Sequence, residues 1–299
     1  MQTKEDVIGL CRIKPGTRVR LSDFDPGWAG DKAIPKKERK EIAEKVLSDD
    51  VEELSDAQDR LYASDTCSVL IIFQAMDAAG KDGTIRHVMS GINPQGCQVF
   101  SFKQPSAEEL DHNYLWRYMK CLPERGRIGI FNRSYYEEVL VVRVHPELVE
   151  RQRIPGLVAG KRLWQERYEE INHFEQHLAR NGTIILKFFL NISPDEQRKR
   201  FLERLTNKEK HWKFSSSDLT ERAFWKDYMK AYEEMLSSTS TSWAPWHIIP
   251  ADHKWVTRSI VAATITEAIR SLKLKYPEIS HEMLKQVDTA RKILQEEEK

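Results

Sequence analysis

Five short, continuous apolar runs constrain the fold of this chain more than any other feature of its sequence. Each run is long enough for one strand, and segments with the periodicity of amphipathic helices separate successive runs. Such runs are typical of strands buried on both faces, as in a parallel sheet covered by helices on its two sides. The sequence therefore predicts an α/β fold with a five-stranded parallel sheet. The expected strands are Cys67–Ala75, Cys97–Phe102, Ile128–Phe131, Thr183–Leu190 and Trp246–Ile249.

Helical patterns divide the chain into three parts. A polar, turn-rich lead-in and a charged helical stretch, Lys36–Tyr62, predict an accessory arm over residues 1–63. Residues 64–275 contain the expected strands and a long helical segment, Lys161–Arg180, and they form the predicted core. Residues 276–299 are a predicted helical tail with an acidic, solvated end.

Composition limits the class of protein and its partners. The 47 basic and 46 acidic residues leave a formal net charge of +1, so the whole chain does not attract nucleic acid or acidic membranes. The four cysteines are scattered without a CxxC pair, which favours reduced thiols over disulfides or structural zinc. No apolar stretch could span a bilayer, and the first residues lack a secretory signal pattern. We expect a cytoplasmic protein in which any polyanion site is a local basic cluster.

A glycine-containing loop follows the first predicted strand and precedes a predicted helix. The segment Ala75–Thr84 reads AMDAAGKDGT and nearly matches the phosphate-binding motif G-x-x-x-x-G-K-[ST]. In such a loop, backbone N–H groups and the helix N-terminus hold phosphate oxygens, and the lysine adds a positive charge. The match predicts a phosphotransferase of P-loop kinase architecture with Lys81 as a catalytic residue. The expected phosphate-binding backbone belongs to Ala78, Ala79, Gly80, Gly83 and Thr84.

Two residues depart from the usual motif. Ala75 stands at the first glycine position, and Asp82 stands where a hydroxyl residue normally binds magnesium. Asp77 adds a carboxylate inside the loop, where it would repel phosphate unless a divalent cation lay between them. Asp77 and Asp82 are therefore predicted metal ligands with a catalytic role. In the alternative interpretation, both carboxylates cap the helix N-terminus and interact with its dipole.

Polar residues follow the second and third predicted strands at the carboxyl edge of the sheet, where α/β folds bind ligands. Arg133 is suited to bind a phosphate there and is a predicted catalytic residue. Asn132 is a candidate phosphate- or nucleotide-binding residue, and Asn132 or Glu137 could hold the metal, directly or through water, although a glutamate there also suits the helix dipole. Lys103 and Arg117 are candidate phosphate-binding residues, with positions on a helix surface as the alternative.

A dense basic cluster lies between the fourth predicted strand and the next amphipathic helix. Arg198, Lys199 and Arg200 fit a solvated helix face as well as a binding site. The later residues form a basic and aromatic loop around Trp212, which predicts a lid over about residues 206–218 that closes on phosphates. The predicted phosphate-binding residues of this cluster are Arg204, Lys208, Lys210 and Lys213.

Seven segments in this order resemble the polyphosphate kinase 2 family, whose fold is related to that of thymidylate kinase. The resemblance covers most of the chain and implies a three-layer P-loop kinase fold with a helical lid. It also implies a homo-oligomer, either a dimer or a tetramer. The segments that carry the resemblance are Arg18–Asp23, Ala75–Gly83, Ser101–Pro105, Phe131–Glu137, Asn172–Glu175, His211–Phe214 and Pro250–Trp255.

The resemblance implies phosphoryl transfer between inorganic polyphosphate and adenine or guanine nucleotides. The cofactor would be Mg²⁺, with Mn²⁺ as a second candidate, and Asp77 and Asp82 would help to hold it. Lys81 would contact the transferring phosphate, and Arg133 would bridge the donor and acceptor phosphates. The loop Lys208–Lys213 would be the lid.

One pairing points to a subgroup of the family. Many relatives have aspartate where this chain has Asn132, and they lack a carboxylate at the position of Glu137. The pairing of Asn132 with Glu137 resembles the subgroup that phosphorylates both AMP and ADP.

Two other functions stay open at the level of the sequence. The second pKa of a phosphate monoester lies near ~6, so the acceptor phosphate needs no strong base, and cations with in-line positioning suffice. An ATP-dependent nucleoside monophosphate kinase would use the same machinery but would also need a pocket for the donor base. A non-catalytic polyphosphate- or nucleotide-binding regulator would bind phosphates without turnover.

Overall fold

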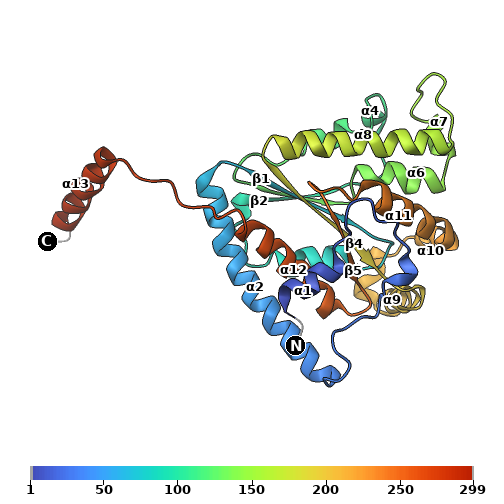
Figure 1. Ribbon diagram of the computed structural model, residues 1–299, viewed down its shortest axis with the longest axis horizontal. Helices are drawn as coiled ribbons and strands as arrows, with labels where there is room; N and C mark the ends of the chain where they lie inside the picture. The colour runs from blue at the N-terminus through green and yellow to red at the C-terminus, as the bar shows by residue number, and fades with distance from the viewer. Residues whose placement is uncertain (1–2, 298–299) are drawn as a thin grey trace.

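The five predicted strands form one parallel sheet in the computed structural model, which describes residues 3–297 (Figure 1). The order across the sheet is β2, β3, β1, β4 and β5, and all neighbouring strands are parallel. Each boundary lies within one residue of the boundary predicted from the apolar runs, which confirms the fold class. The strands are β1 (Ser68–Gln74), β2 (Cys97–Ser101), β3 (Ile128–Asn132), β4 (Thr183–Asn191) and β5 (Trp246–Pro250).

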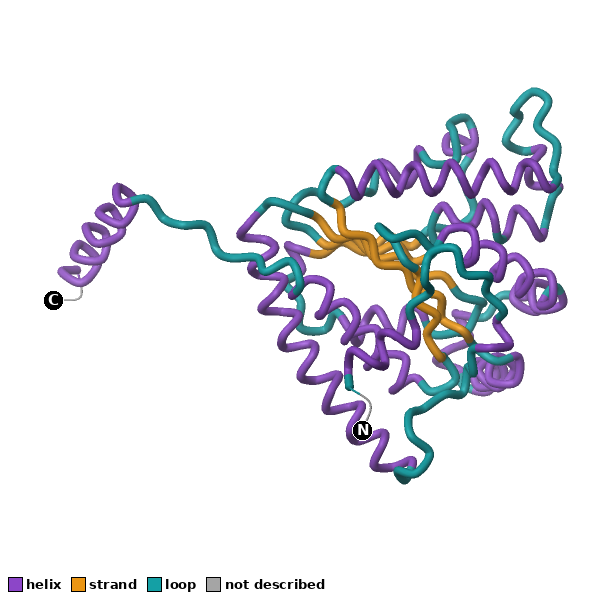
Figure 2. Tube along the Cα trace, viewed as in Figure 1, coloured by secondary structure: helices purple, strands orange, loops and turns teal. Residues whose placement is uncertain are grey.

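Helices cover both faces of the sheet and complete a three-layer fold (Figure 2). The long helices are α2 (Lys36–Ser64), α8 (Lys161–Arg180), α11 (Trp225–Thr239) and α12 (Lys254–Arg270). On one face α12 packs against α2, α3 (Lys81–Val88) and α1 (Lys4–Cys11). On the other face α11 packs against α8 and α6 (Val141–Val144). The predicted accessory arm is thus partly built into a helical layer of the core.

Shorter elements connect the main ones. The short α-helices are α4 (Ala107–Leu110), α5 (Trp116–Met119), α7 (Glu147–Glu150), α9 (Pro194–Thr206) and α10 (Ser216–Ala223). The 3₁₀ helices are η1 (Leu21–Asp23), η2 (Pro94–Gly96), η3 (Tyr135–Val139) and η4 (Lys208–Lys213). The predicted lid at about 206–218 corresponds to η4 and the start of α10.

The core lies on both sides of the central strands. Every residue of β1, β3 and β5 is buried, because helices cover both faces of these strands. Across the sheet, Phe73 of β1 and Phe188 of β4 stack with ring centroids 5.2 Å apart. Strand β1 leads directly into the loop at the carboxyl edge.

The C-terminal helix α13 (His281–Glu297) stands apart from the body of the molecule (Figure 1). It contains no buried residue, and residues 271–280 connect it to α12. The helical tail that the sequence predicts is therefore present, but it adds nothing to the core. Among residues 3–297, no helix combines the length and the apolar character needed to cross a bilayer.

Candidate active site at the carboxyl edge of the sheet

The loop between β1 and α3 has a conformation that few side chains tolerate. Ala78 has φ +62° and Gly80 has φ +105°, both in the left-handed region. For alanine, this conformation costs roughly 1–2 kcal/mol, so the surrounding structure must hold it in place. Gly80 is the N-cap of α3, and no side chain among residues 3–297 caps this helix. Neither Asp77 nor Asp82 is therefore the capping residue, but Asp82 lies in the first turn of α3, where its negative charge suits the helix dipole as the alternative interpretation holds.

Lys81 lies at the start of α3 and is buried, with 8% of its surface exposed. Its Nζ donates a hydrogen bond to the carbonyl oxygen of Ala75 at 2.9 Å. Burial lowers the pKa of Lys81 to about 8, and the neighbouring charge of Arg133 acts in the same direction. The carboxylate of Asp77 opposes this shift. Lys81 is thus cationic at neutral pH, and its ammonium group contacts the start of the loop between β1 and α3.

Arg133 follows β3 and connects two acidic residues. One guanidinium nitrogen donates to Asp77 Oδ1 at 2.6 Å, and another donates to Glu137 Oε2 at 3.3 Å. The carboxylate of Glu137, followed by that of Asp77, raises the pKa of Arg133 above its ordinary value. The backbone of Arg133 has φ +66°, again in the left-handed region. The predicted catalytic residues Asp77, Lys81 and Arg133 are therefore neighbours in the structure.

The acidic residues proposed as metal ligands are not all together. Asp82 Oδ1 accepts a hydrogen bond from Asn132 Nδ2 at 2.8 Å, while Glu137 Oε2 accepts one from Arg133 at 3.3 Å and lines the second cavity. Within residues 3–297, no group of three or more His, Cys, Asp or Glu side chains is close enough to hold a metal ion. Magnesium, however, is commonly held by one or two carboxylates together with substrate phosphates. Asp77 and Asp82 line the first cavity and fit that donor set, while Asp77 and Glu137 line the second cavity together, so the role of Glu137 as a metal ligand stays a prediction.

Two cavities lie at this edge of the sheet. The first has a volume of about 750 Å³ and extends from the phosphate loop to α9 and α10. The second has a volume of about 500 Å³ and extends from the same point toward α6, η3 and α11. Six residues line both cavities, so the two spaces meet. The shared residues are Asp77, Phe102, Lys103, Gln104, Arg133 and Asp218.

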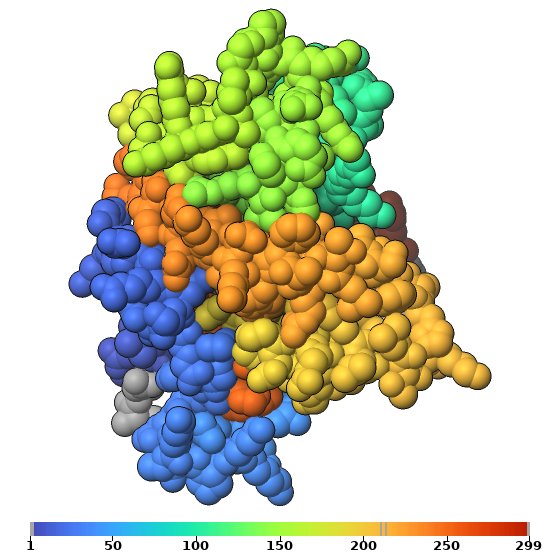
Figure 3. Space-filling model, turned by 90° about the vertical axis from the view of Figure 1, so that its right-hand side faces the viewer, coloured from blue at the N-terminus to red at the C-terminus, as the bar shows by residue number. Residues whose placement is uncertain are grey.

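The two cavities differ in their linings. The first is dominated by ionisable groups: Asp77, Lys81, Asp82, Lys103, Arg133, Arg200, Glu203, Arg204, Asp218 and Lys254. The second also contains aromatic and aliphatic side chains: Phe102, Leu110, Tyr118, Leu140, Leu148, Tyr228 and Tyr232. In Figure 3, which looks at this side of the molecule, residues of α9 and α10 (yellow to orange) project from the surface. The first cavity suits a chain of phosphates, and the second suits a molecule with one apolar part.

Arg200 lines the first cavity, although the sequence analysis gave it no more weight than its neighbours Arg198 and Lys199. Only 5% of its surface is exposed, and its guanidinium donates to the carbonyl oxygens of Ala78 (3.1 Å) and Ala79 (2.8 Å). It also donates to the carbonyl oxygens of Ala251 (2.7 Å) and Asp252 (3.1 Å). Arg200 therefore ties α9 to the strained phosphate loop and to the end of β5. It is not part of a solvated helix face.

Helix α9, the predicted lid segment and α12 contribute further residues to the first cavity. Arg204 donates to Asp218 Oδ2 at 3.3 Å, which links α9 to α10. Burial, and then the charge of Asp77, raise the pKa of Asp218. Trp212 lies at the rim and lines the cavity although 79% of its surface is exposed. Glu203, Asp218 and Lys254 lie at the site as well, and sequence reasoning did not select them.

Several predicted phosphate-binding residues lie elsewhere. Arg117 is 7% exposed, and it donates to Glu109 Oε2 at 3.0 Å and to the carbonyl oxygen of Lys103 at 2.7 Å. Arg117 lines the second cavity and holds the backbone at Lys103. It is therefore not on an exposed helix surface, and it is not among the described residues that line the first cavity. Lys208 is exposed on η4 and is not among the described residues that line the first cavity.

Of the residues predicted to bind phosphate through their backbone, some line the first cavity and others do not. Ala78, Gly80 and Gly83 line the first cavity, but Ala79 and Thr84 are buried and, among the described residues, do not line it. Thr84 points into the core because it lies one turn into α3. The side chains of Lys210 and Lys213 lie outside the described part of the structure.

Together, the sheet order, the strand–loop–helix unit at β1 and the basic carboxyl edge define a P-loop kinase fold. The model of the polyphosphate kinase 2 (PPK2) family matches residues 37–277, and the chain belongs to that family. It is 57% identical over 268 residues to an ADP-polyphosphate phosphotransferase of Rhodopseudomonas palustris, covering 89% of this chain and 91% of the relative. It is 45% identical over 267 residues to an AMP/ADP-polyphosphate phosphotransferase of Meiothermus ruber, covering 89% of this chain and 94% of that relative.

A solved structure supports the same assignment. The crystal structure of polyphosphate kinase 2 from Arthrobacter aurescens superposes on this fold with a TM-score of 0.85 and 36% sequence identity. The superposition covers 95% of both chains. The family resemblance that the sequence motifs carried is confirmed.

Proposed function

We propose that this protein transfers phosphoryl groups reversibly between inorganic polyphosphate and the nucleotides AMP and ADP. The observation that carries the proposal is the meeting of two cavities of different character at Arg133. A transferase must hold a donor and an acceptor in line with each other, and the junction of two cavities provides such a point. The names of the two relatives from Rhodopseudomonas and Meiothermus agree with polyphosphate as donor and with ADP or AMP as acceptor.

The first cavity is the proposed site of polyphosphate. Its loop backbone and Lys81 bind anionic oxygens, and Arg200 holds the loop in the conformation that binding requires. Arg204 and Lys254 add positive charge further along the cavity. A phosphate chain carries charge along its whole length, so a cavity lined mainly by ionisable groups is suited to it.

The second cavity is the proposed site of the acceptor nucleotide. Phe102, Tyr118 and Tyr232 offer aromatic surface to a base, while Lys103 and Arg133 at the junction attract its phosphates. The terminal phosphate of the acceptor is already largely deprotonated near neutral pH, so no residue has to act as a strong base. Arg133 stabilises the charge on the phosphoryl group that is transferred.

We propose that Mg²⁺ is the cofactor and that Mn²⁺ can replace it. Asp77 and Asp82 would hold the ion together with donor phosphates. When bound, the ion supplies positive charge that reduces the repulsion between the two anionic substrates. The residues of the chain position these substrates and exclude competing water as the lid over 206–218 closes.

The experiment that tests the proposal compares polyphosphate with ATP as phosphoryl donor, with AMP and with ADP as acceptors. Formation of ADP and ATP from polyphosphate is expected with both acceptors. Turnover with ATP but none with polyphosphate would show instead an ATP-dependent nucleoside monophosphate kinase.

One observation favours that second candidate function. Trp212 at the rim of the first cavity offers an aromatic surface on which a donor base could stack. The variant Trp212→Ala separates the two functions, because it should weaken an ATP donor much more than a polyphosphate donor. A non-catalytic regulator predicts binding that Lys81→Ala weakens, with no turnover to lose.

We also propose that the protein acts in the cytoplasm as a homo-oligomer, either a dimer or a tetramer. Light scattering coupled to size-exclusion chromatography measures the number of subunits directly, and a monomer at micromolar concentration would contradict this part of the proposal.

A further inference from the structure

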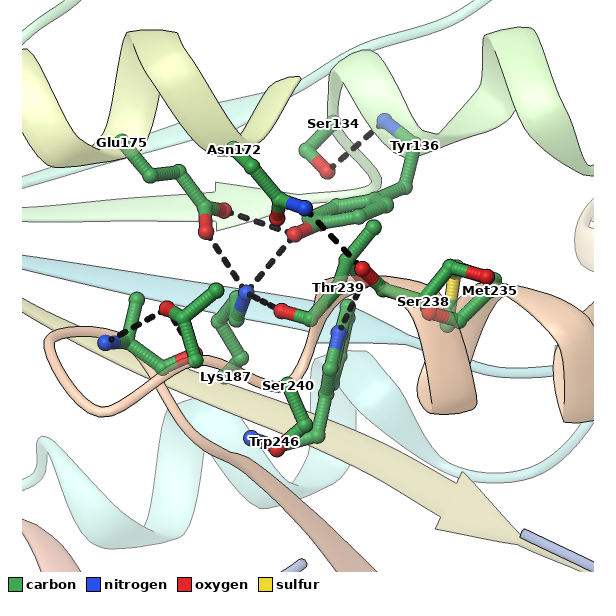
Figure 4. A network of polar contacts seen from close by, with 12 residues as sticks. Ser134, Tyr136, Asn172, Glu175, Lys187, Met235, Ser238, Thr239, Ser240 and Trp246 are labelled. Atoms are coloured by element: carbon green, nitrogen blue, oxygen red, sulfur yellow. Dashed lines mark hydrogen bonds and ion pairs between the residues drawn. The ribbon is translucent and has the colours of Figure 1, made fainter. Parts of the chain in front are cut away.

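A fully buried ion pair links β4 to α8 behind the site. Lys187 of β4 and Glu175 of α8 both have 0% exposure, and Lys187 Nζ lies 2.6 Å from Glu175 Oε2 (Figure 4). Lys187 Nζ also donates to the hydroxyl of Tyr136 at 2.7 Å and to the carbonyl oxygen of Thr239 at 2.8 Å. Glu175 Oε1 accepts from the hydroxyls of Tyr135 (2.8 Å) and Tyr136 (2.7 Å). All three donors of the ammonium group thus have partners.

Stability alone does not explain this pair. Burying two charges carries a desolvation cost of several kcal/mol per ion, and apolar residues of similar volume are often equally stable or more stable. The neighbours of Lys187 in the sheet register are Ile72 and Trp246, which are themselves apolar. Burial lowers the pKa of Lys187, while the nearby carboxylate of Glu175 opposes the shift. The specific result of the pair is that it fixes two tyrosine hydroxyls.

Those tyrosines begin η3 and follow the turn that carries Arg133. The turn is strained, because Arg133 has φ +66°, which costs roughly 1–3 kcal/mol for a non-glycine residue. Such a conformation persists only where several contacts determine it. The N–H of Arg133 donates to the carbonyl oxygen of Phe73 at 3.1 Å and holds one end of the turn. The two tyrosines hold the other end.

Ring packing strengthens this connection. Tyr135 meets Phe174 edge-to-face at 5.4 Å, and Tyr136 meets Trp246 at 4.8 Å. With the rings enclosed and the hydroxyls bound to one carboxylate, η3 has little freedom to rotate about its axis. The guanidinium of Arg133 then lies between Asp77 and Glu137, where the two cavities meet.

We propose that Glu175 and Lys187 are positioning residues for Arg133, acting through the hydroxyls of Tyr135 and Tyr136. Their described hydrogen bonds go to Tyr135, Tyr136 and Thr239 and to each other, and their effect on phosphoryl transfer passes through the turn before η3. The inference rests on the proposed function, in which Arg133 acts on the transferred phosphate.

A double-mutant cycle between Glu175→Gln and Arg133→Ala tests the proposal. Two quantities are measured well below the melting temperature of each variant: kcat with polyphosphate and ADP, and the Kd for tripolyphosphate by calorimetry. Glu175→Gln should lower kcat by about 10–100-fold in the wild-type chain, the range expected when a charge-assisted hydrogen bond to substrate is misplaced. In the Arg133→Ala background, the same change should alter kcat and Kd by less than about 2-fold.

An equal effect of Glu175→Gln in both backgrounds would overturn the proposal, because the pair would then act only through stability. If the wild-type chain shows no turnover with polyphosphate, the proposed function fails, but the Kd cycle still tests the positioning. A lower melting temperature with unchanged kcat per folded molecule would also contradict the inference.

Two further variants keep the test independent of folding. Tyr135→Phe and Tyr136→Phe remove only the hydroxyls, and together they should lower kcat at least 5-fold while KM changes less than 2-fold. Asp50→Asn is the matched control, because Asp50 is a fully buried carboxylate that pairs with Lys4 on the opposite helical layer. It should lower the melting temperature and leave kcat unchanged.

Discussion

The hydrogen bonds from Arg200 to the phosphate loop, here called the Arg200 clamp, allow a quantitative prediction. In Arg200→Met, a side chain of similar length remains, but four hydrogen bonds to backbone carbonyl oxygens are lost. A hydrogen bond to a charged group contributes roughly 1.5–3 kcal/mol, and contributions from one guanidinium are not additive. Since Arg200 is 5% exposed, solvent does not replace these bonds. We therefore expect a loss of about 3 kcal/mol in the free energy of unfolding.

For a chain of this size, that loss lowers the melting temperature by roughly 5–10 °C. The loop also loses the contacts that hold Ala78 at φ +62°, so binding of tripolyphosphate should weaken by about 10-fold or more. Differential scanning calorimetry measures the first effect and isothermal titration calorimetry measures the second.

Lys199→Met is the matched control for this experiment. Lys199 is the preceding residue on α9, its side chain is 66% exposed, and its ion pair in the described structure is with Glu196 at 3.5 Å. Such a change is expected to alter stability by less than about 0.5 kcal/mol. If Arg200→Met and Lys199→Met have the same melting temperature and affinity, the clamp does not exist as described.

Three other predictions concern the loop and the tail. Because burial lowers the pKa of Lys81 to about 8, kcat/KM for polyphosphate should be highest below pH 8 and fall as the pH rises toward 9, and Lys81→Met should abolish this decline along with most activity. Asp77→Asn and Asp82→Asn should each lower kcat at least 100-fold with melting temperatures within about 3 °C of wild type; a steep fall in melting temperature with activity retained would refute this. Deletion of residues 281–299 should leave kcat and melting temperature unchanged, since α13 buries no residue.

The strands and the phosphate loop could be predicted because their signals are local. A continuous apolar run such as Val69–Phe73 is stable only where both faces are covered, so the run alone predicts a central strand with helices on both sides. The cap at Ser193, which accepts a hydrogen bond from the N–H of Glu196 at 3.1 Å, fixes the start of α9 in the same local way.

The role of Arg200 could not be predicted so simply, because Arg198, Lys199 and Arg200 have similar chemistry in sequence. What separates them is the face of α9: Gln197, Arg200 and Phe201 are buried together. The i, i+3, i+4 spacing of Gln197, Arg200 and Phe201 is the pattern in the sequence that indicates one buried helix face. By contrast, the partner of Arg117 is Glu109, and an irregular segment brings the two together, so no periodicity could have indicated that pair.

The pairing of Arg133 with Asp77 and Glu137 means that this cation carries its own counter-ions, covalently attached to the chain. A phosphate that reaches Arg133 exchanges places with a carboxylate and releases fewer dissolved ions than a free arginine would. Polyanion binding weakens steeply with salt when mobile counter-ions are released, so the salt dependence here should be shallower than the number of basic groups suggests. Internal competition of this kind also discriminates among anions. Chloride or a single sulfate competes poorly with two fixed carboxylates, whereas a chain of linked phosphates, anchored elsewhere in the cavity, presents its next phosphate at high local concentration.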